Sequence, residues 1–226
     1  MSQFNLKVAF TSEQLGILYA TGTNVIIAKS SDGRPPSVAW QVFKPLQSNT
    51  VSWKEEYGIY ASTAPIRNGA VLSQLANTPI GIERGKQYIL QNYGAISGPH
   101  DGGFPNAFIF ANQYAGLPYI TAGLYQNASV NGIDITSNAI SAIPVLMQSN
   151  AIMNPSTSIY IWLQSQVVSN SVVTMVTSPM TELKFGGSVT DISITYNSAS
   201  GKFVPAKSNT LKSTSDQPFN HIEPSL

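Results

Sequence analysis

The chain has 226 residues, of which 42% are hydrophobic and 10% are charged, and its formal net charge is +1. A near-neutral chain lacks the clustered Lys and Arg that phosphates require, which excludes nucleic acid as the main partner. The absence of cysteine excludes disulfides and thiolate metal sites. The N-terminus alternates instead of following the signal-peptide pattern, and no apolar run reaches about 18 residues. We therefore expect a protein that is cytoplasmic as made, without a membrane-spanning helix.

Period-2 alternation and β-branched runs predict an all-β chain with one short helix. Phe4–Phe10 alternates and is predicted as the first strand. Thr11, with Gln14 three residues later, predicts a capped helix over about 12–20 that Gly22 ends. The other predicted strands, in chain order, are 24–29, 38–44, 50–61, 87–91, 106–113, 119–125, 158–166, 171–177 and 188–196.

Turn residues divide these strands. Residues 38–44 and 50–61 are predicted to form a hairpin, and Asn68-Gly69 and Asn131-Gly132 are predicted as tight turns. Gly and Pro predict a loop over 94–105. Many short strands bounded by turns favour a β-sandwich-like single domain over residues 1–205, followed by a polar C-terminal tail over residues 206–226.

Two tryptophan-bearing segments raise a hypothesis of internal duplication. Trp40 and Trp162 each lie on a predicted strand that leads into a Ser-Asn turn and a β-branched strand. One interpretation is two similar halves around a pseudo-two-fold axis. The alternative, which we favour, is that any two hairpins share such a composition.

Charge is almost absent from the middle of the chain. Between Asp101 and Glu182 the only charged residue is Asp134, and Ser, Thr, Asn and Gln supply the polarity. A surface of this kind repels its neighbours weakly, which favours a homo-oligomer or a neutral ligand. Tyrosines flanked by amides suit stacking on a neutral sugar, whereas the alternative for each tyrosine is core packing. The predicted ligand-binding residues are Tyr88, Tyr93, Tyr114, Tyr119, Tyr125, Asn106 and Asn112.

Groups suited to catalysis or metal binding are few. His100 and Asp101 are weak catalytic candidates, because a His titrates near neutral pH. A turn is the favoured interpretation, since adjacent residues of a strand point apart and the run is rich in Gly. We expect no metal and no cofactor, because a metal site needs several converging ligands. The remaining candidate ligands are scattered or sit in turns: His221, Asn131, Asp134 and Asn138.

In composition the chain resembles cytoplasmic fungal and bacterial lectins and defence proteins, although no motif carries the likeness. We expect a non-enzymatic, self-associating protein with lectin-like recognition of a neutral glycan or cell-surface ligand. One alternative is a pore-forming or membrane-active defence protein that uses a hairpin over residues 156–177; only this alternative involves a membrane. The others are an enzyme that uses His100 and Asp101, and a purely structural, assembly-forming protein.

Overall fold

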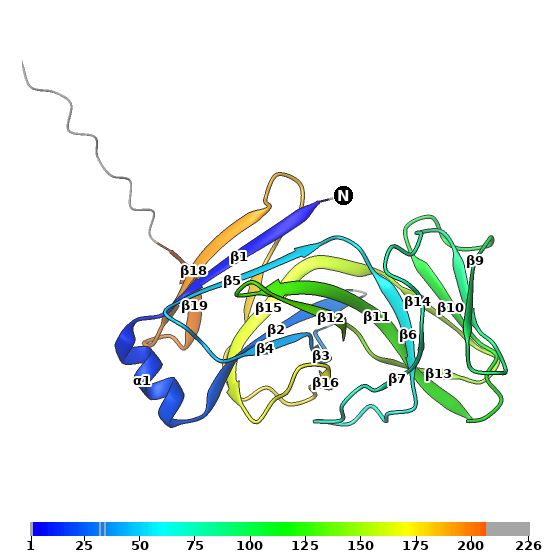
Figure 1. The fold of residues 1–226 in the computed structure, drawn as a ribbon, viewed down its shortest axis with the longest axis horizontal. Helices are drawn as coiled ribbons and strands as arrows, with labels where there is room; N and C mark the ends of the chain where they lie inside the picture. The colour runs from blue at the N-terminus through cyan, green and yellow to red at the C-terminus, as the bar shows by residue number, and fades with distance from the viewer. Residues whose placement is uncertain (1, 32, 34, 207–226) are drawn as a thin grey trace, which may run out of the picture.

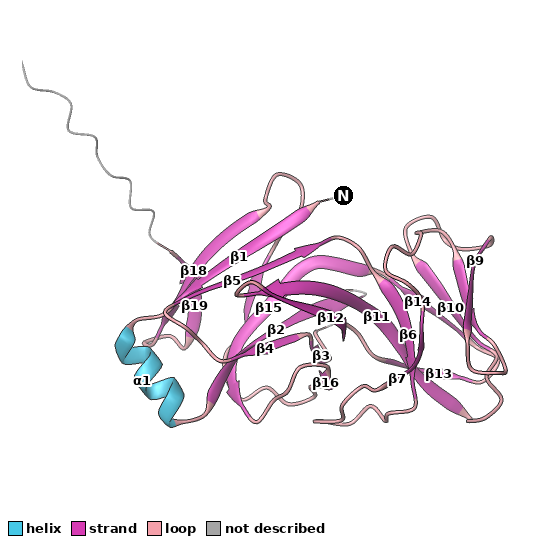
Figure 2. Cartoon of the chain, viewed as in Figure 1, coloured by secondary structure: helices cyan, strands magenta, loops and turns pink. Residues whose placement is uncertain are grey.

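The computed structural model describes residues 2–31, 33 and 35–206, so the predicted tail beyond Ala206, with His221, lies outside the described residues. The first half contains α1 (Ser12–Ala20) and the strands β1 (Gln3–Ala9), β2 (Thr23–Ser31), β3 (Val38–Ala39), β4 (Gln41–Phe43), β5 (Ser48–Lys54), β6 (Gly58–Ser62), β7 (Gln74–Asn77), β8 (Gln87–Leu90), β9 (Ile96–His100) and β10 (Phe108–Asn112). The second half adds β11 (Tyr119–Val130), β12 (Ile133–Ala139), β13 (Ile143–Leu146), β14 (Asn150–Met153), β15 (Pro155–Ser165), β16 (Ser171–Val172), β17 (Thr181–Leu183), β18 (Asp191–Asn197) and β19 (Lys202–Pro205). The prediction of an all-β, sandwich-like chain with one short helix is confirmed (Figure 2).

The helix α1 begins at the capping box that the sequence predicts. The backbone N–H of Gln14 donates to Thr11 Oγ1 at 3.2 Å, and the backbone N–H of Thr11 donates to Gln14 Oε1 at 3.0 Å. Gly22, with φ of +61°, follows the last turn and lets the chain reverse into β2. Within the described residues, no helix is both long enough and apolar enough to cross a membrane.

Three sheets of four or more strands form the body. The largest follows the order β19-β18-β1-β5-β11-β6-β7, with β12 and β13 also paired to β11. A second sheet runs β14-β10-β8-β9, a third runs β17-β15-β2-β4, and β16 pairs with β3. Figure 1 shows β9, β10 and β14 at one end of the molecule, with α1, β18 and β19 at the other.

One hydrophobic cluster joins these sheets. On β1, Phe4, Leu6 and Val8 are buried while their neighbours are more exposed, as period-2 alternation predicts. The same cluster includes Ile27 of β2 and Phe110 of β10. The second sheet therefore has one face fixed against the core and the other available to solvent.

The predicted hairpin of residues 38–44 and 50–61 is wrong. β4 pairs with β2, whereas β5 pairs with β1 and β11, so the intervening residues carry the chain from one sheet to another. The turn at Asn68-Gly69 exists, but Val71 bridges to Ser171 and not to residues 65–66. Local turn signals do not reveal such long-range pairing.

Other strands also differ from the prediction: β11 extends to Val130, β15 begins at Pro155, and β7, β12, β13, β14, β17 and β19 were not predicted. The loop predicted over 94–105 contains β9, an edge strand paired with β8, where Pro99 is tolerated because only one edge is hydrogen-bonded. The strand predicted over 171–177 is reduced to β16.

The two tryptophan-bearing segments have different partners. Trp40 lies between β3 and β4, and Trp162 lies on β15. β4 and β15 both flank β2 in one sheet, while β5 and β16 pair elsewhere. The two hairpins on which the duplication hypothesis depends are therefore absent.

A lysine is buried in the core. Lys29 of β2 is 1% exposed, and its ammonium lies 4.9 Å from the ring centroid of Trp40 and 5.1 Å from that of Trp53. Cation–π attraction from two rings offsets part of the lost hydration. Burial lowers the pKa of Lys29 to about 7, although the negative charge of Glu55 acts in the opposite direction.

Substitution Gly123→Ala should destabilise the protein by about 3 kcal/mol or more. Gly123 of β11 faces the carbonyl of Ser141, and an added Cβ would overlap that oxygen, which is backbone and cannot rotate away. Urea denaturation would measure the change. The control is Gly16→Ala in α1, where no atom lies within 4 Å and helix propensity predicts a gain of about 1 kcal/mol. Equal effects of the two substitutions would contradict this packing.

Lys29 should make stability depend on pH. Between its folded pKa of about 7 and its ordinary value of 10.5, the unfolded chain binds a proton that the folded chain does not. The free energy of unfolding should therefore rise with pH, by at most about 1.4 kcal/mol per unit. Burial raises the pKa of Tyr57 and of Tyr60, but this lowers stability only above their ordinary value of 10.

Urea titrations between about pH 7.5 and pH 9 would measure this slope. Lys29→Met keeps the length of the side chain and removes the charge, so its slope should be nearly flat. Parallel slopes for the wild type and the variant would show that Lys29 does not lose its proton on folding.

Candidate functional site

The solvent-facing side of the second sheet carries an uncharged hollow. Tyr88 and Leu90 of β8 and Phe108 and Phe110 of β10 point into the core. Side chains on the opposite face therefore point outward. These side chains, together with Asn112 and residues that follow β10 and β13, frame a hollow of about 450 Å³, which we call the amide hollow, lined by Gln87, Ala111, Asn112, Gln113, Ala115, Met147, Gln148 and Asn150.

The hollow exists because a short side chain lies between longer ones. Ala111 of β10 is directly opposite Asn150 of β14 and Ile89 of β8. The methyl group of Ala111 lines the bottom of the hollow, and the longer amide side chains of Gln87 on β8 and Asn150 on β14 line its sides. A larger residue at Ala111 would fill the space.

Backbone hydrogen bonds fix the rim. The N–H of Gln148 donates to Asn112 O at 2.8 Å, and that of Asn112 donates to Ser149 O at 3.0 Å. The N–H of Gln113 donates to Leu90 O at 2.9 Å. The buried side chain of Asn112 is fully engaged, because Nδ2 donates to Val145 O and Oδ1 accepts from the N–H of Tyr114. The rim is therefore preorganised, and the free amides are those of the outward side chains.

The chemistry of the lining is neutral and bifunctional. The amides of Gln87, Gln113, Gln148 and Asn150 each offer two donors and an acceptor, and no lining residue carries a charge. Such a set matches hydroxyl groups, which also donate and accept.

Three of the predicted tyrosines lie at the end of the sheet that holds the hollow. Tyr93 is 78% exposed, and its turn contacts the loop of Tyr114 because the N–H of Ala115 donates to Asn92 Oδ1 at 3.2 Å. Tyr119 is 43% exposed and is opposite Leu146, next to the Met147 rim. None of these tyrosines lines the hollow, and of the seven predicted residues only Asn112 is part of its lining.

The other three predicted residues do not line the hollow. Tyr88 is buried and its hydroxyl accepts from the N–H of Glu83, while Tyr125 is buried and its hydroxyl donates to Thr78 O. Burial raises the pKa of both phenols. These two tyrosines contribute to the core, which is the alternative that the sequence left open. Asn106 is exposed but lines a separate hollow beside Phe104.

His100 and Asp101 have different partners. Asp101 Oδ1 accepts from Lys86 Nζ at 2.7 Å, a hydrogen bond that lowers the pKa of Asp101 and raises that of Lys86. His100 Nε2 lies 3.1 Å from Ser97 Oγ, which also accepts from Gln91 Nε2 at 2.7 Å. The predicted acid–base pair is therefore not assembled.

The other candidate residues have structural roles. Asn131 Oδ1 accepts from the N–H of Thr50, and Asn138 Nδ2 donates to Trp40 O. In the described part of the chain, no group of three or more His, Cys, Asp or Glu is placed to hold a metal ion. The segment considered for a membrane hairpin includes β15, which pairs with β2 and β17 and buries Ile159 and Ile161.

Sequence reasoning missed most of the hollow. Gln87, Gln113, Gln148 and Asn150 were not predicted, because an exposed amide has no periodicity that separates it from other surface residues. The one sequence signal for these four residues was their position: three lie in the uncharged middle stretch, and Gln87 lies just before it.

Comparisons with known proteins found no matching family model, no similar curated protein and no similar solved structure.

Proposed function

We propose that this chain is a non-enzymatic, self-associating binding protein that recognises a neutral glycan in the amide hollow. The observation that carries the proposal is a hollow of about 450 Å³ with four free amide side chains and no charged group. Tyr93 and Tyr119 are exposed near the same end of the sheet and add aromatic surface.

The shape and chemistry of the hollow favour a sugar over other small ligands. A sugar ring presents hydroxyls at its rim and C–H groups on its faces. The amides suit the hydroxyls, while Ala111, Ala115 and Met147 offer apolar contact to the faces. An anionic ligand would lack a cation here, because Lys86 is already paired with Asp101.

A second feature supports the self-association included in the proposal. Val71, Val168 and Met175 are 51%, 54% and 64% exposed, and their loops lie together through the Val71–Ser171 bridge and the hydrogen bond from Thr174 N to Asn68 Oδ1. Burying these side chains against a second copy would remove apolar area from water. A dimer would also present two hollows and so bind a multivalent surface more strongly.

A glycan array should identify neutral glycans that bind the wild type, and Gln113→Ala combined with Asn150→Ala should weaken that binding at least tenfold. Both side chains are exposed and outward-facing, so the substitutions remove hydrogen bonds to the ligand without opening the core. The matched control is Gln47→Ala, which removes an exposed amide that lines no hollow described here.

Haemagglutination would test the same point on cells. Absence of binding to any neutral glycan, or equal losses in the double variant and the control, would refute recognition at the amide hollow.

Sedimentation velocity should show species larger than the 24.2 kDa monomer for the wild type. Val168→Asp should shift the protein to the monomer, because a charge in a buried apolar contact is costly. Val189→Asp places the same charge at a valine that is 42% exposed in a different turn, and it should leave the assembly intact. A monomeric wild type, or dissociation by both variants alike, would exclude the patch as the contact.

A further inference from the structure

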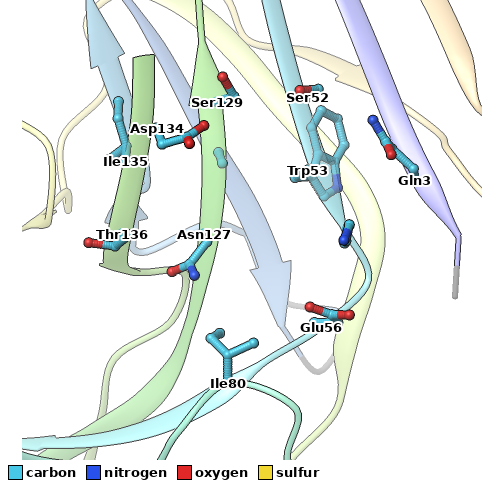
Figure 3. A pocket seen from close by; sticks show the side chains of 12 residues that line it. Gln3, Ser52, Trp53, Glu56, Ile80, Asn127, Ser129, Asp134, Ile135 and Thr136 are labelled. Atoms are coloured by element: carbon cyan, nitrogen blue, oxygen red, sulfur yellow. The ribbon is translucent and has the colours of Figure 1, made fainter. Parts of the chain in front are cut away.

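A second hollow opens in the largest sheet, at the point where β11 changes its partner from β6 to β5. β11 pairs with β5 at Ser129 and Val130, and with β6 over residues 121–125. No ladder therefore joins residues 126–128 to residues 53–57. The side chain of Gln126 spans this gap by donating to Lys54 O at 2.6 Å. The result is a groove of about 320 Å³, shown in Figure 3 and lined by Gln3, Ser52, Trp53, Lys54, Glu56, Ile80, Asn127, Ala128, Ser129, Asp134, Ile135 and Thr136.

A buried donor without a partner lines the groove. Trp53 is 3% exposed, and within the described residues its Nε1–H makes no hydrogen bond. The other two tryptophans are satisfied: Trp40 donates to Gln126 O and Trp162 to Gln164 Oε1, both at 2.9 Å. Since an unsatisfied buried donor costs stability, Trp53 offers a ligand oxygen a favourable contact.

Unpaired charges surround that donor. Among the described residues, Lys54, Glu56 and Asp134 form no ion pair within 4.0 Å, and together they leave the groove with one excess negative charge. Figure 3 shows Asp134 and Glu56 on opposite sides of the groove, attached to different strands or loops. Asp134 is also the only charged residue between Asp101 and Glu182.

Neutral polar groups fill the rest of the wall. Gln3, Ser52, Asn127, Ser129 and Thr136 supply amides and hydroxyls, and Ile80 and Ile135 supply an apolar contact. A ligand that satisfies all of these needs several hydroxyls, an oxygen that accepts from Trp53 and a cationic group for the carboxylates.

We propose that this groove binds an amino sugar with a free amine. The carboxylates of Asp134 and Glu56 attract the ammonium from opposite sides of the groove, a hydroxyl oxygen accepts from Trp53 Nε1, and the remaining hydroxyls contact Ser52, Asn127 and Ser129. Neutral sugars lack the charge that these carboxylates attract, and anions are repelled by them. This site is separate from the amide hollow, and its ligand differs in charge.

NMR titration of the full chain with glucosamine tests the proposal. The spectrum should contain three indole N–H signals, and Trp53→Phe assigns that of Trp53 by its disappearance. The titration is run at mildly acidic pH, where the sugar amine is protonated. The signal of Trp53 should then shift with glucosamine while those of Trp40 and Trp162 stay in place.

Asp134→Asn and Glu56→Gln should each weaken glucosamine binding about tenfold or more, because each removes one of the negative charges that attract the ammonium. Asp191→Asn is the matched control, since this exposed carboxylate accepts from Asn5 and Thr190 away from the groove. Glucose, N-acetylglucosamine and ethanolamine are the ligand controls.

The proposal fails if the Trp53 signal does not respond, if glucose or N-acetylglucosamine binds as well as glucosamine, or if Asp134→Asn has no effect. Equal binding of ethanolamine would overturn recognition of the sugar ring. If glucosamine does not bind in the groove, the proposal of glycan binding at the amide hollow still stands. The two sites can be told apart because Gln113→Ala with Asn150→Ala should not alter the glucosamine titration.

Discussion

β11 must pair with four strands, and both hollows follow from how it does so. One edge of this strand serves β13 at residues 119–122 and β12 at residues 125–130, and the other serves β6 and then β5. Each stretch of a strand edge can pair with only one partner, and the change from β6 to β5 leaves residues 126–128 without a ladder on that edge, although β12 still pairs along the other. At its other end, pairing with β13 positions the turn that forms the rim of the amide hollow.

The gap beside β11 also explains why the core beneath it is polar. Trp40 donates to Gln126 O, and Gln126 donates to Lys54 O, so side chains replace the missing backbone ladder. Lys29 lies under the same region, with Trp40 and Trp53 on its ammonium. Trp53 contacts the buried cation with its ring and is also one of the residues that line the groove. Trp53 therefore connects the groove to Lys29, because it contacts both.

Local sequence patterns predicted those structural features that depend on interactions between residues near in sequence. The capping box of Thr11 and Gln14, the alternation of β1 and the turn at Asn131-Gly132 depend on residues near in sequence, and all three were predicted. The partners of β4 and β5 depend on contacts across the fold, which alternation does not encode. For the same reason a tyrosine on a strand could not be assigned to core or surface: Tyr88 and Tyr125 are buried, whereas Tyr93 and Tyr119 are exposed.

The uncharged middle stretch has two roles that composition alone does not separate. Much of it is core, since β10 and β11 bury most of their residues. The remainder supplies the amides of Gln113, Gln148 and Asn150 at the hollow of the second sheet, where no charge competes for a neutral ligand. Its one charged residue, Asp134, is placed at the groove beside β11. The two sites therefore differ in charge: the amide hollow is lined by no charged residue, whereas the groove is lined by Asp134 together with Lys54 and Glu56, whose charges act at short range there.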